Sequence, residues 1–379
     1  MTTVGDDSSG SAHRRVLGLP KYGDLGASSR LRFSQYLPYL AEAGLDVTSA
    51  PLLSDRLLAA RYAHGGYGGS ALLASYLSRC RRLASRGGYD LLWIEKEALP
   101  WWPSALESAL LRGVPCAFDY DDAVFHAYDR HPRAIVRRLF GRRIDHLMRR
   151  AALVVAGNTY LAGRARQAGA PRVEILPTVI DLERYRPEAS VGPVADGPAR
   201  VVWIGSPSTA RYLELLREPL AELARQRPFV LRVVGGGAVH LPGVPVEVLP
   251  WTEEGEVALL RGAVAGIMPL ADSPWERGKC GYKLVQYMAC GLAVVASPVG
   301  VNRELVREGD NGYLAADGAD WIRALRALLD DADLRARLGA AGRRQVEQEY
   351  CVQRTGPRLA GWLREVSRAS PTGDAGGRS

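Results

Sequence analysis

The sequence predicts an α/β fold of two doubly wound parallel-sheet domains that face each other across a cleft. The chain has 379 residues, which is longer than one ordinary α/β domain. Short apolar segments alternate with helical segments along its whole length, as in strand–helix–strand units with right-handed crossovers. These apolar segments fall into two sets of six, one in each half, so each half is expected to form its own sheet.

Most of the strand segments are continuous apolar runs, which predicts strands that are covered on both faces of a parallel sheet. In the first half the runs lie at residues 15–20, 45–50, 90–95, 114–119, 151–156 and 173–177. In the second half they lie at residues 200–205, 229–234, 244–249, 264–269, 293–297 and 312–315. Ligands of open parallel sheets bind at the carboxyl ends of the strands, so we expect a binding site in the cleft between the two domains.

A composition change marks the boundary between the halves. Residues 187–199 are rich in Pro, Gly and Ala and show no periodicity, which is typical of a linker. Both ends of the chain are polar, and we expect them to be disordered. The predicted organisation is therefore a tail at 1–14, a first domain at 15–186, the linker, a second domain at 200–350, a helix at 351–368 and a tail at 369–379.

Composition argues against several classes of protein. No apolar run reaches the roughly 18 residues of a membrane span, and the start of the chain has no signal-peptide core, which favours a cytoplasmic protein. The five cysteines include no CxxC pair and the six histidines show no ligand spacing, so neither a disulfide framework nor a metal cofactor is expected. The net charge of +8 is not accompanied by a nucleic-acid-binding module, so nucleic acid is not an expected partner.

Residues 133–150 predict one basic amphipathic helix with seven arginines. Its apolar residues recur at helical spacing on one face, and they are Ile135, Val136, Leu139, Phe140, Ile144, Leu147 and Met148. We favour a helix that packs this stripe on the sheet and leaves the arginines in solvent. The alternative is a peripheral contact with an anionic membrane.

Three loops join strands to helices, where free backbone N–H groups can hold an anion. In the first loop Gly26 lets the chain turn, and Ser28, Ser29 and Arg30 follow at a helix start. Serine at that position is also a common cap, so this loop alone is weak evidence. In the second loop Gly205 ends a strand, and around Pro207 the chain carries the hydroxyls of Ser206, Ser208 and Thr209 and the guanidinium of Arg211. The alternative for this loop is a plain capped helix.

The third loop is the richest in anion-binding groups. It carries Gly278, Lys279, Gly281 and Lys283 before a helix, together with Cys280 and Tyr282. Two lysines beside a glycine-rich helix start predict a cradle for a diphosphate. Gln286 lies one turn further along the helix, where it is expected to bond a ribose hydroxyl.

Residues 266–315 resemble the donor-site signature of the retaining glycosyltransferases of family 4. The segment YMACGLAVVASPVGVNRELVREGDNGYLA, at 287–315, matches the second part of that signature closely. That family has the GT-B fold, two Rossmann-like domains facing across a cleft. The segment PTVIDLERYRP at 177–187 is similar to the end of the family's first domain, and the resemblance extends over about residues 15–345. It implies an acceptor-binding first domain, a second domain that binds a nucleotide sugar, and a C-terminal helix that crosses back to the first domain. It also implies retention of the anomeric configuration without a metal ion.

The chain departs from this signature at its two glutamates, whose positions hold Gly278 and Gln286. We expect Glu276, two residues earlier, to replace the first glutamate in catalysis. We expect Lys279 and Lys283 to bind the diphosphate, with Lys283 stabilising its developing charge. The family's arginine in the second loop is Ser206 here, with Arg211 near the lysine that follows it. By its place in the fold, Trp251 is expected to border the base.

Three carboxylates follow the fourth strand, namely Asp119, Asp121 and Asp122. Asp119 and Asp121 match a DxD metal motif of the other major glycosyltransferase fold, but the doubled parallel-sheet pattern argues against that interpretation. We expect Asp119 and Asp122 to bond the acceptor and Asp121 to assist its hydroxyl. The alternative is that these carboxylates only cap a turn.

The sequence therefore predicts a hexosyltransferase-type enzyme that moves a sugar from a nucleotide-diphosphate donor to a glycan, lipid-linked or natural-product acceptor. Two other functions stay open. One is a GT-B-type nucleotide-sugar epimerase. The other is a catalytically silent nucleotide-sugar-binding protein, which the two replaced glutamates suggest.

Overall fold

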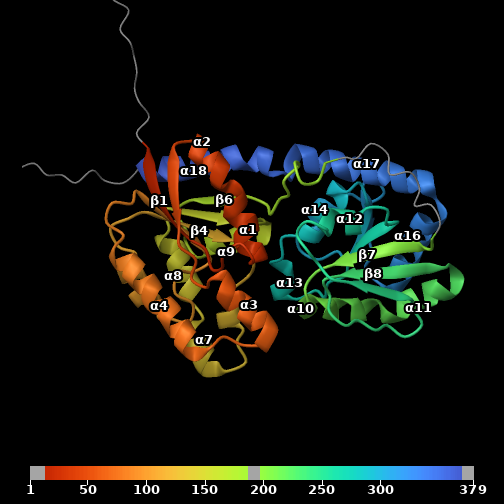
Figure 1. Cartoon of the computed structure of the whole chain (residues 1–379), viewed down its shortest axis with the longest axis horizontal. Helices are drawn as coiled ribbons and strands as arrows, with labels where there is room; N and C mark the ends of the chain where they lie inside the picture. Colours follow the sequence, from red (N-terminus) through yellow and green to blue (C-terminus); the bar gives the residue numbers. More distant parts are fainter. Residues whose placement is uncertain (1–12, 187–196, 369–379) are drawn as a thin grey trace, which may run out of the picture.

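The computed structural model describes residues 13–186 and 197–368, which form two α/β domains side by side (Figure 1). Each domain contains a sheet of six parallel strands, ordered β2-β1-β3-β4-β5-β6 in the first and β12-β11-β10-β7-β8-β9 in the second. The predicted fold class is confirmed. Most of the predicted linker and nearly all of the two predicted tails lie outside the described residues.

Each of the twelve predicted strands is present within two residues of its expected ends. The first sheet consists of β1 (Arg14–Leu19), β2 (Leu45–Ser49), β3 (Leu91–Glu95), β4 (Cys116–Tyr120), β5 (Leu153–Ala156) and β6 (Val173–Ile175). The second consists of β7 (Ala199–Ile204), β8 (Phe229–Val234), β9 (Val246–Leu249), β10 (Ala265–Met268), β11 (Ala293–Ala296) and β12 (Gly312–Leu314). Every residue of β3, β4, β5 and β11 is buried, because helices cover both faces of each sheet.

Helices connect most successive strands in both domains, whereas a loop without a helix joins β8 to β9. Those of the first domain are α1 (Ala27–Arg32), α2 (Leu37–Glu42), α3 (Asp55–His64), α4 (Gly69–Ala84), α5 (Ser104–Leu110), α6 (His126–Asp129), α7 (Ala134–Phe140), α8 (Arg143–Arg150) and α9 (Thr159–Gln167). Those of the second are α10 (Pro207–Ala210), α11 (Arg217–Gln226), α12 (Glu256–Leu260), α13 (Pro274–Arg277), α14 (Tyr282–Ala289), α15 (Asn302–Leu305), α16 (Gly318–Asp330) and α17 (Ala332–Glu349). Two 3-10 helices, η1 (Ser34–Tyr36) and η2 (Arg211–Leu216), complete the set. None of these helices, within the described residues, is long and apolar enough to cross a membrane.

The last helix, α18 (Val352–Arg368), returns to the first domain (Figure 1). Its apolar residues Leu359 and Leu363 lie in the same core cluster as Val16 of β1 and Trp93 of β3. The preceding α17 packs in the second domain, where a β-carbon on Gly342 would lie 2.9 Å from the Met288 side chain of α14. The two helices therefore run along one side of the molecule and span both domains.

The prediction of one helix over residues 133–150 is wrong, because two helices, α7 and α8, occupy this range. The helical conformation is interrupted at residues 141–142. Arg143, expected on the polar face, is buried at the start of α8. Its Nε donates to Glu97 at 2.9 Å, and its Nη2 pairs with Glu107. These buried ion pairs tie α8 to the core, while no residue of α7 is buried.

Candidate functional site

The loops at the carboxyl ends of the two sheets touch each other at the centre of the molecule. Cys280 donates from its Sγ to the carbonyl oxygen of Asp121 at 3.0 Å. Asn158 Nδ2, in the first domain, donates to the carbonyl oxygens of Gly278 and Lys279, both at 3.0 Å. A β-carbon at Gly278 would lie 2.4 Å from the β-carbon of Ala123, so in this arrangement the position has no room for a side chain.

On the first-domain side, the buried carboxylate of Glu95 joins the loops after β1 and β3. It accepts hydrogen bonds from the Lys21 backbone N–H at 2.8 Å, from Ser28 at 2.7 Å and from Ser29 at 2.6 Å. The Ser28 hydroxyl also lies 2.5 Å from Asp121 Oδ2. Ser28 therefore links the end of β3 to the end of β4.

Lys96 is the cation at the centre of this cluster. Its Nζ lies 2.8 Å from Asp121 Oδ1, 3.6 Å from Glu95 and 3.9 Å from Asp122. Burial alone would lower the pKa of Lys96, but Asp121, Glu95 and Asp122 outweigh it and raise that pKa above its ordinary value. Burial opposes ionisation of Asp121 as well, yet Lys96 and Ser28 lower its pKa, so the two groups form a stable ion pair. The backbone φ of Lys96 is +62°, a strained value for a residue that is not glycine.

Two residues that were predicted to contact the acceptor, Asp119 and Ser29, are buried inside the first domain and do not face the cleft. Asp119 is fully buried, and both of its oxygens pair with Arg32, at 2.7 and 3.0 Å. Asp119 still belongs to β4, whereas Asp121 and Asp122 follow the end of the strand, where the cleft begins. Ser29 is also buried and its hydroxyl is bonded to Glu95. Both residues therefore support the loop from within the first domain.

On the second-domain side, the start of α14 carries cations without acidic partners. Within the described residues, no carboxylate oxygen lies within 4.0 Å of the Nζ of Lys279 or Lys283. The Lys283 ammonium lies 5.4 Å from the ring centroid of Trp203. Burial, together with the charge of Lys279, lowers the pKa of Lys283 to about 8, and Asp122 only partly opposes this. Positive charge therefore accumulates opposite Asp122, at the contact between the domains.

The chain has only four lysines, and all four belong to this region. The sequence contains 49 Lys and Arg residues, of which only Lys21, Lys96, Lys279 and Lys283 are Lys. Burial and the nearby Lys96 lower the pKa of Lys21, whereas the surrounding glutamates raise it. Lysine carries a compact ammonium charge that differs from the planar guanidinium of arginine. The scarcity of lysine was a composition signal that would have predicted the involvement of Lys21 and Lys96.

The second loop is open to solvent and is held together by its own hydroxyls. Ser206 donates its backbone N–H to Thr209 Oγ1 at 3.2 Å, and the Ser206 and Ser208 hydroxyls lie 2.9 Å apart. The helix that begins in this loop, α10, ends at Ala210, and the chain continues as the 3-10 helix η2. Because α10 has only about one turn, its dipole is weaker than that of the longer helix that the sequence predicts. A β-carbon on Gly205 would lie 2.6 Å from the Trp203 ring.

Glu276 is buried at α13 and engaged by neighbours of its own domain. Its two carboxylate oxygens accept hydrogen bonds from Tyr212 and from Ser273. Burial raises the pKa of Glu276, but these two bonds outweigh it, and the pKa ends below its ordinary value. Arg211 lies 3.8 Å away on the exposed side. Glu276 is thus a fixed anion that also orients Tyr212.

The residues predicted near the nucleoside belong to one hydrogen-bonded chain. The buried Gln286 donates its Nε2 to Tyr185 at 3.1 Å, and Tyr185 donates to Glu256. Trp251 donates its indole N–H to Glu256 at 2.7 Å. Arg30, in the first domain, lies over the Trp251 ring at 5.3 Å, so this pair bridges the two domains.

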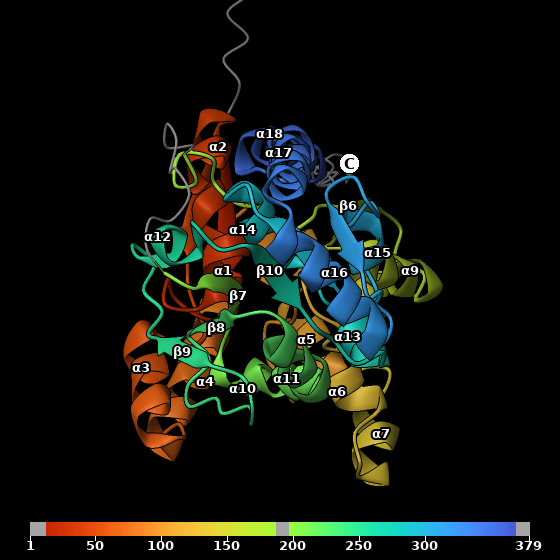
Figure 2. The same ribbon diagram turned by 90° about the vertical axis from the view of Figure 1, so that its right-hand side faces the viewer.

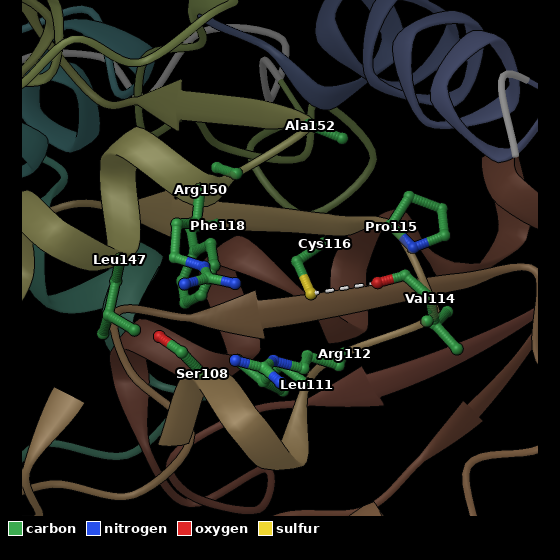
Figure 3. A pocket seen from close by; sticks show the side chains of 12 residues that line it. Ser108, Leu111, Arg112, Val114, Pro115, Cys116, Phe118, Leu147, Arg150 and Ala152 are labelled. Carbon is green, nitrogen blue, oxygen red and sulfur yellow. Dashed lines mark hydrogen bonds between the residues drawn. The ribbon is translucent and has the colours of Figure 1, made fainter. Parts of the chain in front are cut away.

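The structure has one hollow between the two domains and another within the first domain. One of about 420 Å³ lies between the domains, and its wall includes Thr159, Arg277 and Arg303. The other, of about 300 Å³, is lined by Cys116, Arg112 and ten further residues of the first domain (Figure 3). Cys116 begins β4, so this second hollow is at the end of the sheet opposite Asp121. No group of three potential metal-ligating side chains occurs among residues 13–186 and 197–368.

Comparisons with known proteins relate parts of this chain to glycosyltransferases. Residues 198–331 match the family model described as glycosyl transferases group 1. D-inositol 3-phosphate glycosyltransferase of Nocardia farcinica is 29% identical over 195 residues, which cover 44% of this chain and 42% of that protein. Spore coat protein SA of Bacillus subtilis is 35% identical over 75 residues, which cover 19% and 20% of the two chains. The matched segments thus span less than half of either relative.

Solved structures resemble the whole described chain. Sucrose-phosphate synthase of Thermosynechococcus elongatus superposes with a TM-score of 0.70 at 17% identity, covering 94% of this chain and 100% of that one. HepE of Anabaena, solved with UDP, has a TM-score of 0.68 at 18% identity and covers 93% and 100%. The fold is therefore the GT-B fold. Its second domain is similar to those of the group 1 glycosyltransferases.

Proposed function

We propose that this protein is a retaining glycosyltransferase that moves a sugar from a nucleotide-diphosphate donor to an acceptor hydroxyl without a metal ion. The observation that carries the proposal is the unpaired charge of Lys279 and Lys283 at the start of α14, where the two domains meet. A diphosphate is the anion that suits two ammonium groups beside a helix start. The match of this domain to the group 1 family model, and the UDP in the HepE structure, support it.

The proposed chemistry uses charge rather than a strong base. The two lysines stabilise the negative charge that develops on the departing diphosphate. The acceptor oxygen bonds to the anomeric carbon on the face from which the diphosphate leaves, and the leaving phosphate takes the proton of the acceptor hydroxyl. Asp121, kept anionic by Lys96, is in place to orient that hydroxyl from the first domain. Contacts such as Cys280 with Asp121 bring the domains together and limit access of water.

A catalytically silent nucleotide-sugar-binding protein is the second candidate. The position of the family's first glutamate is Gly278, where a side chain would collide with Ala123 in this arrangement. Glu276 is near in sequence, but its oxygens already bind Tyr212 and Ser273. We propose that Glu276 nonetheless acts as the fixed anion of the donor pocket.

A nucleotide screen tests the donor site first. We expect one of UDP, GDP, dTDP and ADP to raise the melting temperature, since a ligand at 100 times its Kd stabilises the native state by about 2.7 kcal/mol. The Lys283→Ala and Lys279→Ala variants should lose most of that shift. The control is Arg225→Ala, an exposed cation of the same domain that pairs with Glu222. Unchanged affinity in both lysine variants, or no shift with any nucleotide, would overturn the donor site.

Transfer assays separate the candidate activities. Mixtures of the matching nucleotide sugar with glycan, lipid-linked and natural-product acceptors should release nucleoside diphosphate only when an acceptor is present, and EDTA should not slow this release. Binding of the nucleotide sugar with no release of nucleoside diphosphate in any mixture would indicate the silent binding protein. A change in the donor's sugar configuration without any acceptor would indicate an epimerase. We place the reaction in the cytoplasm, which fractionation of the native host would test.

A further inference from the structure

Helix α7 is an amphipathic helix that packs only partly on the protein core, through Phe140. Its neighbour α8 buries Ile144, Leu147 and Met148, whereas α7 buries no residue. The aliphatic side chains Ile135 and Leu139 lie one helical turn apart on α7 and are 58% and 67% exposed. The sequence left open whether the 133–150 segment packs on the sheet or meets a membrane. The structure gives most of this packing to α8 and leaves Ile135 and Leu139 of α7 exposed.

An exposed tryptophan extends this apolar face. Trp101 is 51% exposed, and its ring lies 6.4 Å from that of Phe140 in α7 and 5.9 Å from that of His131. Its backbone φ of +66° is unusual for a residue that is not glycine, so the surrounding structure holds it in this position. Tryptophan is enriched where proteins meet the headgroup region of a bilayer.

The surface around α7 is strongly and almost purely basic. Residues 130–150 contain eight arginines and a single acidic residue, Asp145, which pairs with Arg164 at 2.7 Å. Within the part of the chain that the structure describes, no carboxylate lies within 4.0 Å of the arginines at the α7 end of this range, Arg130, Arg133, Arg138 and Arg142. Such a concentration of unpaired guanidinium groups complements an anionic surface.

We propose that α7 and Trp101 form a docking surface for anionic lipid headgroups, with Ile135 and Leu139 inserted at the membrane boundary and the arginines on the phosphates. Exposed aliphatic residues on one face and arginines around them are the features of helices that lie in a membrane interface. In both Figure 1 and Figure 2, α7 is at the extremity of the first domain, so a flat surface can reach it. The proposal is independent of the transferase, because it concerns binding and no reaction.

Vesicle flotation of the full chain, without nucleotide, tests it. We expect binding to vesicles of equimolar phosphatidylcholine and phosphatidylglycerol, weakening as salt rises, and little binding to phosphatidylcholine alone. Each arginine near an anionic surface contributes roughly fivefold to the partition coefficient, so Arg138→Gln with Arg142→Gln should lower it about 25-fold. Ile135→Ser with Leu139→Ser should lower it at least about tenfold, because the apolar anchor is lost.

Matched variants in the second domain serve as controls. Arg225→Gln with Arg323→Gln removes the same amount of charge from exposed sites, and Leu215→Ser removes an exposed aliphatic side chain. Both should bind vesicles like the parent chain, and all variants should keep the parent melting temperature. Equal binding to both vesicle types, equal losses in the control and α7 variants, or self-association through α7 in place of vesicle binding would overturn the proposal.

Discussion

The two sheets meet at their carboxyl ends, but they carry charge there in different ways. In the first domain Lys96 pairs with Asp121, and Arg32 pairs with Asp119. In the second domain Lys279 and Lys283 have no such partner among the described residues. The first surface is electrostatically balanced by the protein's own residues, whereas the second keeps positive charge that only an added anion can balance. This difference separates a cluster whose charges are already paired from a site that can take up an anion, although both contain lysine in a cleft.

The largest expected effect compares the same substitution in the two domains. Lys96→Met should lower the free energy of unfolding by about 3–5 kcal/mol, because it leaves Asp121 and Glu95 buried without their cation. Lys283→Met should leave stability unchanged or raise it, because it removes a partly desolvated cation that has no partner. Urea unfolding at pH 7 measures both values. Equal losses in the two variants would show that the proposed contrast is wrong.

The next effect is on nucleotide binding, where the substitution of Lys283, which should not lower stability, should cause a large loss. A hydrogen bond to a charged group contributes about 1.5–3 kcal/mol, so Lys283→Met should weaken nucleoside diphosphate binding roughly 10- to 150-fold. Arg225→Gln should not weaken it, since that guanidinium pairs with Glu222 on the surface. Isothermal titration calorimetry gives both affinities. Similar losses in the two variants would mean that net charge, rather than the position of Lys283, governs binding.

A smaller effect should appear in the pH dependence. The pKa of Lys283 is about 8 in the folded chain, against 10.5 for an ordinary lysine. Between these values the unfolded chain binds more protons at this lysine, so the parent should gain stability relative to Lys283→Met as pH rises from about 8 to about 10.5. Lys283→Met lacks this proton and should not show that gain. Unfolding free energies of the two proteins across this range measure the difference, and parallel curves would contradict the lowered pKa.

The smallest expected effect concerns the contact between the domains. Arg30 lies over Trp251 and 3.5 Å from Glu253, partly exposed to water. Cation–π contacts at exposed sites contribute about 0.5–1 kcal/mol and exposed ion pairs up to about 1 kcal/mol, so Arg30→Ala should lower the unfolding free energy by no more than about 2 kcal/mol. The matched change Arg61→Ala removes a similar contact, with Tyr67, inside the first domain. Small-angle scattering should show a larger radius of gyration only for Arg30→Ala, and identical radii would exclude a role in closure.

The fold was largely predictable because its evidence is local. Apolar runs predicted twelve strands, since strands buried on both faces need apolar residues at consecutive positions. The break between α7 and α8 was not predictable. It depends on Arg143 reaching Glu97 and Glu107, residues that lie 46 and 36 positions earlier in the chain. Helical spacing predicts which face of a helix an arginine lies on, but it does not show whether buried carboxylates are available to pair with that arginine.

For the candidate site, the sequence by itself determined which loops meet and which residue types they carry. Gly278, Lys279 and Lys283 follow a strand and open a helix, so their position at the cleft follows from local order. Only the tertiary structure decided which charges are already paired. Asp119 and Asp121 are two residues apart, yet one is buried against Arg32 and the other faces the cleft beside Lys96. Coulombic partners depend on distance in space, and β1, β3 and β4 become neighbours only when the sheet assembles.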